Sequence, residues 1–131
     1  MASSVSDYIA GVVNKRVFSL EQANRSLPLV RRIVEDIREA SGKVVDYQEE
    51  FEGLAEGGDS ERAMQSMAAL SKARQEYRAF FRELVQLGCC LSDVRAGAVD
   101  FPAVVGGKQV VLCWRLGESA ISRWQYPGWQ A

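Results

Sequence analysis

The central part of the chain carries a helical pattern of apolar residues. From Val30 onward, apolar side chains recur at alternating steps of three and four positions for more than three heptads. This spacing places them on one face of an α-helix, and so narrow a stripe is typical of a helix that packs against partner helices. The seam consists of Val30, Ile33, Ile37, Ala40, Val44, Tyr47, Phe51 and Leu54. The opposite face is rich in Arg and Glu, and we interpret it as solvent-exposed.

A capping signal marks the beginning of this helix. Ser19 is followed three positions later by Gln22, which matches a capping box, in which the two side chains satisfy main-chain N–H groups of the first turn. Pro28 lacks an amide hydrogen and disfavours a helical conformation of Leu27. Two possibilities follow, a short helix succeeded by a new one that starts near Pro28, or one kinked helix.

A second helix follows a short break at residues 56–59. Asp59 or Ser60 can cap it, and we expect it to run to Leu87, with Gly88 as its left-handed terminating residue. Its apolar positions include Met67, Leu70, Ala73, Tyr77, Phe80, Phe81, Leu84 and Leu87. Two long helices joined by a short loop pack antiparallel, so the pattern predicts a helical hairpin over residues 19–88.

After Gly88 the apolar period changes to that of strands. Residues 97–102 and 108–116 look like two β-strands around a turn at Gly106-Gly107. This turn sets Val99 opposite Trp114, Phe101 opposite Leu112, and Asp100 opposite Cys113. One face, Val99, Phe101, Val110, Leu112, Trp114 and Leu116, should cover the helices, while Asp100, Val111, Cys113 and Arg115 share the other.

These elements predict an α+β fold, mainly α, with a long antiparallel helical hairpin and a C-terminal β-hairpin. We expect a single domain over residues 17–131, in which residues 97–131 hold the β-hairpin and an aromatic-rich tail. The tail contains Ile121, Trp124, Tyr126 and Trp129, and it either wraps the sheet or is presented to a partner. Residues 1–16 are small and polar apart from residues 8–10 and 12–13, and we interpret them as a flexible N-terminal arm.

The composition excludes several function classes. The chain has 131 residues, 47% of them hydrophobic and 25% charged, which is ordinary for one soluble domain. It contains no histidine, so Ser-His-Asp or Cys-His catalysis and His-ligated metal sites cannot operate within one chain. The net charge of −1 disfavours general binding of nucleic acid, which needs a surplus of cations. We expect no cofactor and no metal.

The cysteines and the N-terminus indicate the compartment. Cys89, Cys90 and Cys113 form neither a C-x-x-C pair nor an even set, so a disulfide framework and a four-thiolate zinc site do not fit. The first residues lack the basic and apolar regions of a signal peptide, and no apolar run approaches the about 20 residues of a membrane span. The sequence therefore predicts a cytoplasmic protein without a membrane partner.

Five short blocks give the chain a family resemblance. They are Phe18-Ser19-Leu20-Glu21-Gln22-Ala23-Asn24, Leu27-Pro28-Leu29-Val30, Leu87-Gly88-Cys89, Val99-Asp100-Phe101-Pro102-Ala103 and Leu112-Cys113-Trp114-Arg115-Leu116-Gly117-Glu118. Together they resemble domain of unknown function 2203, an uncharacterised prokaryotic family, over about residues 17–125. The resemblance brings no assigned activity, and it implies a bacterial, cytoplasmic, small protein. It also implies a histidine directly after Trp124, where this chain has Gln125, and a glutamate or similar residue after Cys89, where this chain has Cys90.

The clearest candidate site is the polar face of the predicted β-hairpin. Asp100, Cys113 and Arg115 share this face, and Glu118 lies just beyond it. In a functional interpretation Arg115 binds a carboxylate or phosphate and Asp100 acts as a base. In a structural interpretation Asp100 and Arg115 form a cross-strand pair with Cys113 as a small filler, and this interpretation is favoured. An adjacent carboxylate also disfavours Cys113 as a nucleophile, an effect that only Arg115 opposes.

Two charged sets on the helices are weaker candidates. Arg74, Arg78 and Arg82 are spaced on one helix face and could bind phosphates, but ion pairing within or between chains is favoured. The glutamates of the first helix could form a carboxylate metal site, but such sites in bundles usually include histidine. They are Glu35, Glu39, Glu49, Glu50 and Glu52.

The leading functional hypothesis is self-association. One β-hairpin cannot cover the apolar seams of both long helices, and two helical hairpins packed as a C2 four-helix bundle would bury the remainder. The chain would then be a non-enzymatic oligomerisation or interaction domain, most simply a homodimer. The expected interface residues are Val30, Ile33, Ile37, Val44, Tyr47, Phe51, Tyr77 and Phe80. The rival hypothesis is a binding protein or histidine-free enzyme for a small anionic ligand at Asp100 and Arg115, with Arg95 as a further contact.

Overall fold

A computed structural model describes residues 17–126 of the chain. Two helices are followed by four strands, α2 (Leu20–Glu56), α3 (Ser60–Leu87), β1 (Cys90–Asp93), β2 (Ala98–Val105), β3 (Lys108–Arg115) and β4 (Arg123–Gln125). The strands form one antiparallel sheet in the order β1-β2-β3-β4. The predicted fold class, a mainly helical α+β fold built on a helical hairpin, is confirmed. The predicted N-terminal arm, residues 1–16, and Trp129 of the tail lie outside the described residues.

The helix boundaries follow from local capping. At Ser19 both hydrogen bonds of the capping box are present, with the Gln22 amide donating to Ser19 Oγ and the Ser19 amide to Gln22 Oε1. Asp59 caps α3 by accepting a hydrogen bond from the Arg62 amide. Gly88 ends α3 with a φ of 103°, the left-handed conformation that glycine adopts without a Cβ penalty.

The sequence allowed either two successive helices around Pro28 or one kinked helix. The structure contains one continuous helix. Pro28 lies inside α2, which continues from Leu20 to Glu56. Leu27 and Val30, on either side of Pro28, are buried in the core, whereas Pro28 itself is exposed. Packing of the flanking apolar residues therefore offsets the loss of one main-chain hydrogen bond.

The sheet contains the predicted hairpin in the predicted register. Val99 pairs with Trp114, Asp100 with Cys113 and Phe101 with Leu112, and Gly106 and Gly107 both have positive φ in the turn between the strands. The strands at the two edges of the sheet, β1 and β4, were not predicted. They are only four and three residues long, too short for a clear alternation of apolar and polar residues.

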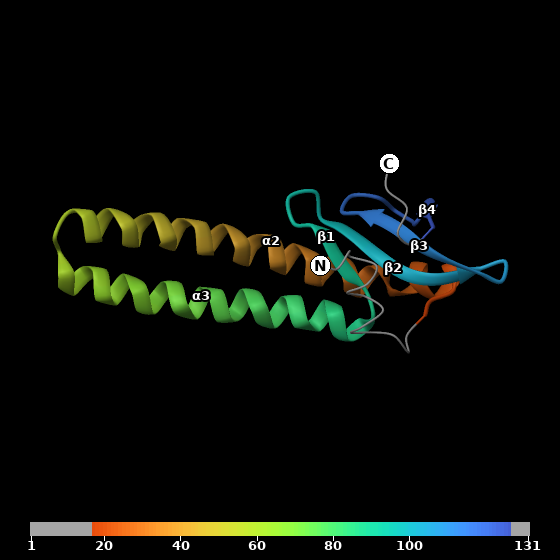
Figure 1. Ribbon diagram of the computed structural model, residues 1–131, viewed down its shortest axis with the longest axis horizontal. Helices are drawn as coiled ribbons and strands as arrows, with labels where there is room; N and C mark the ends of the chain where they lie inside the picture. The colour runs from red at the N-terminus through yellow and green to blue at the C-terminus, as the bar shows by residue number, and fades with distance from the viewer. Residues whose placement is uncertain (1–16, 127–131) are drawn as a thin grey trace, which may run out of the picture.

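The core lies between the sheet and one end of the helical hairpin. Trp114, Phe101, Val99 and Leu112 on the inner face of the sheet are almost fully buried against α2 residues that end at Ile37. Phe18 joins the sheet through a parallel bridge to Ala103 and packs edge-on against Phe101. Figure 1 shows the sheet lying over the start of α2 and the end of α3.

The rest of the helical hairpin extends beyond the sheet as a pair of helices (Figure 1). We call residues 40–56 of α2 and 60–76 of α3 the arm, and Gly57 and Gly58 lie at its tip. At 1.5 Å per residue the α2 part of the arm is about 25 Å long. Its interior consists mainly of small side chains, since Ala40, Ala63, Ser66 and Ala73 are buried there with Leu70 as the largest fully buried residue.

Candidate functional site

A row of four polar side chains crosses the sheet on the face opposite the core. Cys90 on β1 pairs with Asp100 on β2, Asp100 pairs with Cys113 on β3, and Cys113 pairs with Arg123 on β4. Directly paired residues in an antiparallel sheet point to the same face, so the four side chains are neighbours from one strand to the next. The two unpredicted edge strands thus add Cys90 and Arg123 to the candidate site.

Asp100 occupies the centre of this row and is partly buried. Burial raises the pKa of its carboxyl above the ordinary value, and a hydrogen bond with the Cys113 thiol opposes this shift. Among residues 17–126, Asp100 forms no ion pair. The carboxyl therefore holds its proton more tightly than an exposed aspartate.

The two thiols beside Asp100 are held in the protonated state. Burial raises the pKa of Cys90 to about 11, and the charge of Asp100 acts in the same direction. Burial and Asp100 also raise the pKa of Cys113, whereas Arg123 and, more weakly, Arg115 lower it. Since the thiolate is the nucleophile, neither cysteine is activated. The sequence pointed to Arg115 as the opposing cation, but Arg123 has the larger effect.

Arg115 and Asp100 do not form the cross-strand pair that the structural interpretation expected. Arg115 lies opposite Ala98, two positions along β2 from Asp100. Its guanidinium is exposed and has no ion-pair partner in the described part of the chain. The expected pair fails because this register leaves only a diagonal approach between the two side chains, and they do not meet across it.

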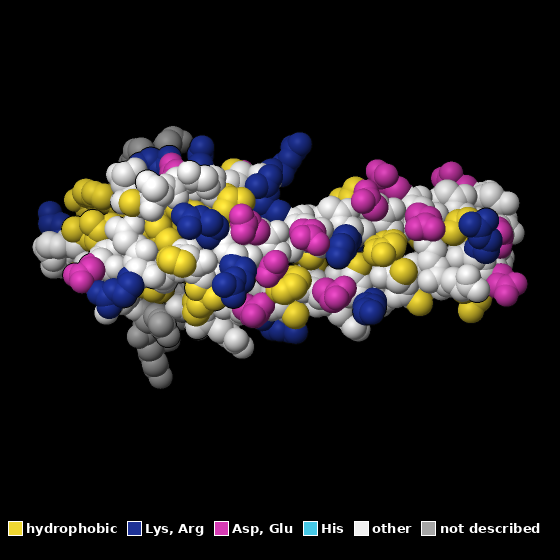
Figure 2. Space-filling view, turned by 180° about the vertical axis from the view of Figure 1, so that it is seen from behind, with side chains coloured by type: hydrophobic (Ala, Val, Ile, Leu, Met, Phe, Trp, Pro, Cys, Tyr) yellow, Lys and Arg dark blue, Asp and Glu magenta, His cyan; other side chains and the backbone are white. Residues whose placement is uncertain are grey.

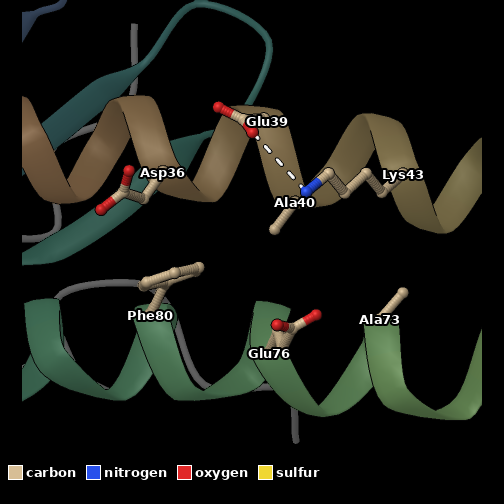
Figure 3. Close-up of a pocket in the computed structure, with 7 residues that line it drawn as sticks. All are labelled: Asp36, Glu39, Ala40, Lys43, Ala73, Glu76 and Phe80. Atoms are coloured by element: carbon tan, nitrogen blue, oxygen red, sulfur yellow. Dashed lines mark ion pairs between the residues drawn. The ribbon is translucent and has the colours of Figure 1, made fainter.

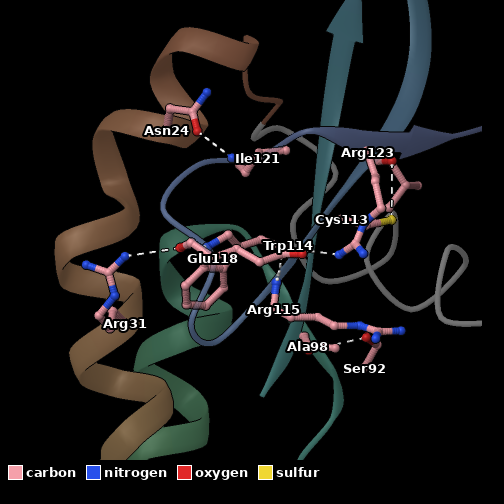
Figure 4. Close-up of polar contacts among 11 residues, drawn as sticks. Asn24, Arg31, Ser92, Ala98, Cys113, Trp114, Arg115, Glu118, Ile121 and Arg123 are labelled. Carbon is pink, nitrogen blue, oxygen red and sulfur yellow. Dashed lines mark hydrogen bonds and ion pairs between the residues drawn. The ribbon is translucent and has the colours of Figure 1, made fainter. Parts of the chain in front are cut away.

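Glu118 contributes to the turn between β3 and β4 and not to a free binding surface (Figure 4). Its Oε1 accepts hydrogen bonds from the Arg115 amide at 2.9 Å and from Arg123 Nη2 at 3.1 Å. Its main-chain oxygen accepts from Trp114 Nε1 at 2.9 Å and from Arg31 Nη2 at 3.3 Å. Ile121, three residues on, donates its amide to Asn24 Oδ1 at 2.8 Å. These bonds attach the turn to α2.

The polar face of the sheet has a shallow hollow of about 440 Å³. It brings three of the predicted site residues together, Asp100, Cys113 and Arg115, and leaves Glu118 outside its lining. The other lining residues are Ser92, Ala98, Trp114, Arg123, Trp124 and Gln125. The hollow thus combines two guanidinium groups with a carboxyl whose pKa is raised by burial. Arg95, suggested as a further contact, is exposed and does not line it.

A smaller hollow of about 110 Å³ lies between the helices where the arm begins (Figure 3). Asp36, Glu39 and Lys43 from α2 and Glu76 and Phe80 from α3 surround it, and Lys43 Nζ lies 3.6 Å from Glu39 Oε1. Within residues 17–126 no three Cys, Asp or Glu side chains converge as metal ligands.

The predicted interface residues fall into two groups. Val30, Ile33 and Ile37 are buried in the core of a single chain, because the sheet covers this part of the seam, so they are not available to a second copy. The remaining ones, Val44, Tyr47, Phe51, Tyr77 and Phe80, are partly exposed.

Of the three arginines proposed for phosphate binding, Arg74 is engaged within the chain. Its Nη2 donates to Gln48 Oε1 at 2.6 Å, across the two helices of the arm. Arg78 and Arg82 are exposed.

Comparison with known proteins gives a family. The model of the family described as uncharacterized conserved protein, DUF2203, matches residues 16–128. The chain belongs to this family. No curated protein and no solved structure matches it.

The fold gives the DUF2203 blocks physical roles. The block that ends in Trp-Arg-Leu-Gly-Glu forms the end of β3 and the start of the β3–β4 turn, where Gly117 has a φ of 103° and Trp114 is buried. Gln125, where the resemblance implies histidine, lies on β4 opposite Val111 and lines the hollow on the sheet. This DUF2203 member therefore has a side-chain amide on the same face of the sheet as Asp100 and Cys113. In addition, none of its described helices is long and apolar enough to cross a membrane.

Proposed function

We propose that the chain is a non-enzymatic interaction module that forms a homodimer through its helical arm. The observation that carries this proposal is the incomplete cover of the arm. Val44, Tyr47 and Phe51 belong to the same apolar seam of α2 whose earlier part, up to Ile37, is covered by the sheet. These three residues lie between the two helices of the arm and remain partly exposed. Two arms packed together as a four-helix bundle would bury more of these side chains.

The outer surface of the arm also carries apolar side chains. Val45, Met64 and Met67 are exposed by 53%, 75% and 40%. Single exposed apolar residues are common, but three of them on one short pair of helices form a surface typical of protein contacts. Figure 2 shows exposed apolar side chains among acidic and basic ones along the arm.

We further propose that the protein acts in the cytoplasm of a bacterium. Within residues 17–126, Cys89, Cys90 and Cys113 form no disulfide bond. Reduced cysteines are typical of the cytoplasm, and the family resemblance is to a prokaryotic group.

Sedimentation velocity tests self-association directly. We expect the full chain to sediment as a dimer at micromolar concentration, and the double variant Val45→Glu with Met67→Glu to sediment as a folded monomer, since it places two charges in the contact. Leu29→Glu is the matched control, because Leu29 is 46% exposed on α2 but lies outside the arm. A wild-type chain that is monomeric at this concentration would contradict the proposal.

A second candidate function is binding of a small anion in the hollow on the sheet. The supporting observation is that the exposed guanidinium of Arg115 lines the same hollow as Arg123. Guanidinium binds carboxylate or phosphate bidentately. Inorganic phosphate and citrate are suitable probes in a thermal-shift titration.

Variants of the residues that line the hollow test the anion hypothesis. Arg115→Ala should abolish a citrate- or phosphate-dependent rise in Tm, and Asp100→Asn should change its size. Lys108→Ala is the control, since Lys108 is an exposed cation of the same strand outside the hollow. If both variants alter only the stability of the free protein, the hollow is a structural feature.

A further inference from the structure

One side of the arm presents matching stripes from both helices. On α3, residues at steps of three or four positions are Ser60, Met64, Met67, Ser71, Arg74, Arg78 and Arg82. On α2, residues with the same spacing are Arg38, Ser41, Val45, Gln48, Glu52 and Glu56. Such spacing keeps residues on one helix face. The hydrogen bond from Arg74 to Gln48 joins the stripes, so they lie on the same side of the hairpin. We call this surface the Met67 face.

The Met67 face is sorted by charge along its length. Arg38, Arg78 and Arg82 lie at its base, near the sheet, and none of them has an ion-pair partner within residues 17–126. Glu52 and Glu56 lie near the tip and are exposed. Two exposed apolar residues of the arm, Val45 and Met67, lie between the two charged ends, and a third, Met64, lies near the tip at the level of Glu52. The order from base to tip is therefore basic, apolar, acidic.

We infer that a second copy of this chain docks on the Met67 face with its arm antiparallel to the first. This inference rests on the proposed self-association and adds its face and direction. A two-fold axis across the middle of the arm brings the tip of each copy to the base of the other, so Glu52 and Glu56 meet Arg78 and Arg82 twice. The apolar middle then meets itself. A parallel arrangement would place arginine against arginine and glutamate against glutamate, which is unfavourable.

The opposite side of the arm fits a second copy less well. That side holds the hollow in Figure 3, with Asp36, Glu39 and Glu76 near the base, where Lys43 is already paired with Glu39. Glu50 lies toward the tip, two positions from Glu52 and off its stripe. Antiparallel docking there would bring Glu50 of one copy toward carboxylates of the other. Charge complementarity therefore selects the Met67 face.

Charge reversal tests the direction of docking. The base-reversed variant is Arg78→Glu with Arg82→Glu, the tip-reversed variant is Glu52→Lys with Glu56→Lys, and the combined variant carries all four substitutions. We expect each reversal alone to raise the dimer Kd by about tenfold or more at low ionic strength, and the combined variant to return close to the wild-type Kd. Sedimentation velocity measures the Kd, and far-UV circular dichroism verifies that each variant is folded.

Two matched controls change charge elsewhere on the arm. Lys72→Glu and Glu50→Lys alter exposed residues of α3 and α2 outside the two stripes, and should leave the Kd within about twofold of wild type. The combined variant has the wild-type net charge, so its recovery cannot come from net charge.

The outcomes separate the two proposals. A dimer that neither reversal weakens, or that the combined variant fails to restore, overturns antiparallel docking on this face while self-association stands. A wild-type chain that is monomeric overturns both. A monomeric chain that binds a DNA duplex through Arg78 and Arg82 also overturns both, and it makes the arginines a phosphate-binding surface.

Discussion

The indole Nε1 of Trp114 donates a hydrogen bond to the main-chain oxygen of Glu118 at 2.9 Å. Trp114 is fully buried, and the guanidinium of Arg31 lies over its ring at 5.9 Å while donating to the same oxygen. One buried side chain thus joins β3, the turn that follows it and α2. The family block that ends in Trp-Arg-Leu-Gly-Glu therefore has a role in folding that needs no ligand.

Trp114→Phe should destabilise the fold. Phenylalanine keeps an aromatic ring but has no donor for the Glu118 oxygen and leaves part of the indole volume empty, so we expect a loss of about 2 to 4 kcal/mol in the free energy of unfolding. Urea denaturation measures this value. Trp124→Phe is the control, because Trp124 is 51% exposed and should change stability by less than about 0.5 kcal/mol. Equal losses in both variants would contradict the role of the buried hydrogen bond.

Gly97→Ala should be costly for two separable reasons. Gly97 has a φ of +63°, and a Cβ at this position would lie 2.7 Å from Leu116 Cβ and 3.2 Å from Val34 Cγ1. Gly107 has a φ of +79°, and an added methyl group there would meet nothing within 4 Å, so Gly107→Ala isolates the backbone cost of about 1 to 2 kcal/mol. We expect Gly97→Ala to exceed this value by at least about 1 kcal/mol in urea denaturation. Equal losses in Gly97→Ala and Gly107→Ala would show that the main chain before β2 shifts to accommodate the added methyl group.

Ser66→Ala should stabilise the arm. Ser66 is 7% exposed, and its Oγ is a buried side-chain polar atom without a hydrogen-bond partner in the described chain. Alanine removes this buried hydroxyl and has a higher helix propensity, so we expect a gain of about 1 kcal/mol. Ser71→Ala, at an exposed position of the same helix, measures the propensity contribution alone. If the two variants gain equally by urea denaturation, the buried hydroxyl carries no penalty.

Asp100 should make stability fall as the pH rises. Its pKa is raised in the folded state, so the folded protein binds more protons than the unfolded protein above the ordinary carboxyl pKa of about 3.9. The free energy of unfolding therefore falls as the pH rises above that value. Asp100→Asn should flatten this part of the stability-versus-pH profile. At neutral pH the variant should be at least as stable as the wild type. Asp46→Asn, an exposed residue of the arm, is the control. A profile that is unchanged by Asp100→Asn would contradict the pKa shift. Denaturation at a series of pH values measures it.

The cysteines beside Asp100 should alkylate slowly, and in a defined order. Cys90 is buried with a pKa of about 11, whereas Cys113 is partly exposed and Arg123 lowers its pKa. We therefore expect iodoacetamide to modify Cys113 before Cys90 at neutral pH, with both slower than a free thiol. Asp100→Asn removes the neighbouring charge and should speed both reactions, and Arg123→Gln should slow the reaction of Cys113. Peptide mapping by mass spectrometry gives the rates. Faster modification of Cys90 than of Cys113 would contradict this order.

Local pattern determined the helical hairpin and the central strands of this protein. The capping box at Ser19, Gly88 at the end of α3 and the Gly106-Gly107 turn depend on a few neighbouring residues, and the turn in turn sets the register of Asp100 against Cys113. Such features can be predicted from the sequence because their energetics are local.

Tertiary structure decided the composition of the candidate site and the extent of the free helical surface. Cys90 and Arg123 flank Asp100 and Cys113 only because two short strands, which have no pattern of their own, add to the sheet edges. The seam of α2 is continuous in sequence, yet the sheet buries Ile37 and leaves Val44 partly exposed. A helical period shows that a stripe is apolar, but which element covers each part of it depends on contacts between residues far apart in the chain.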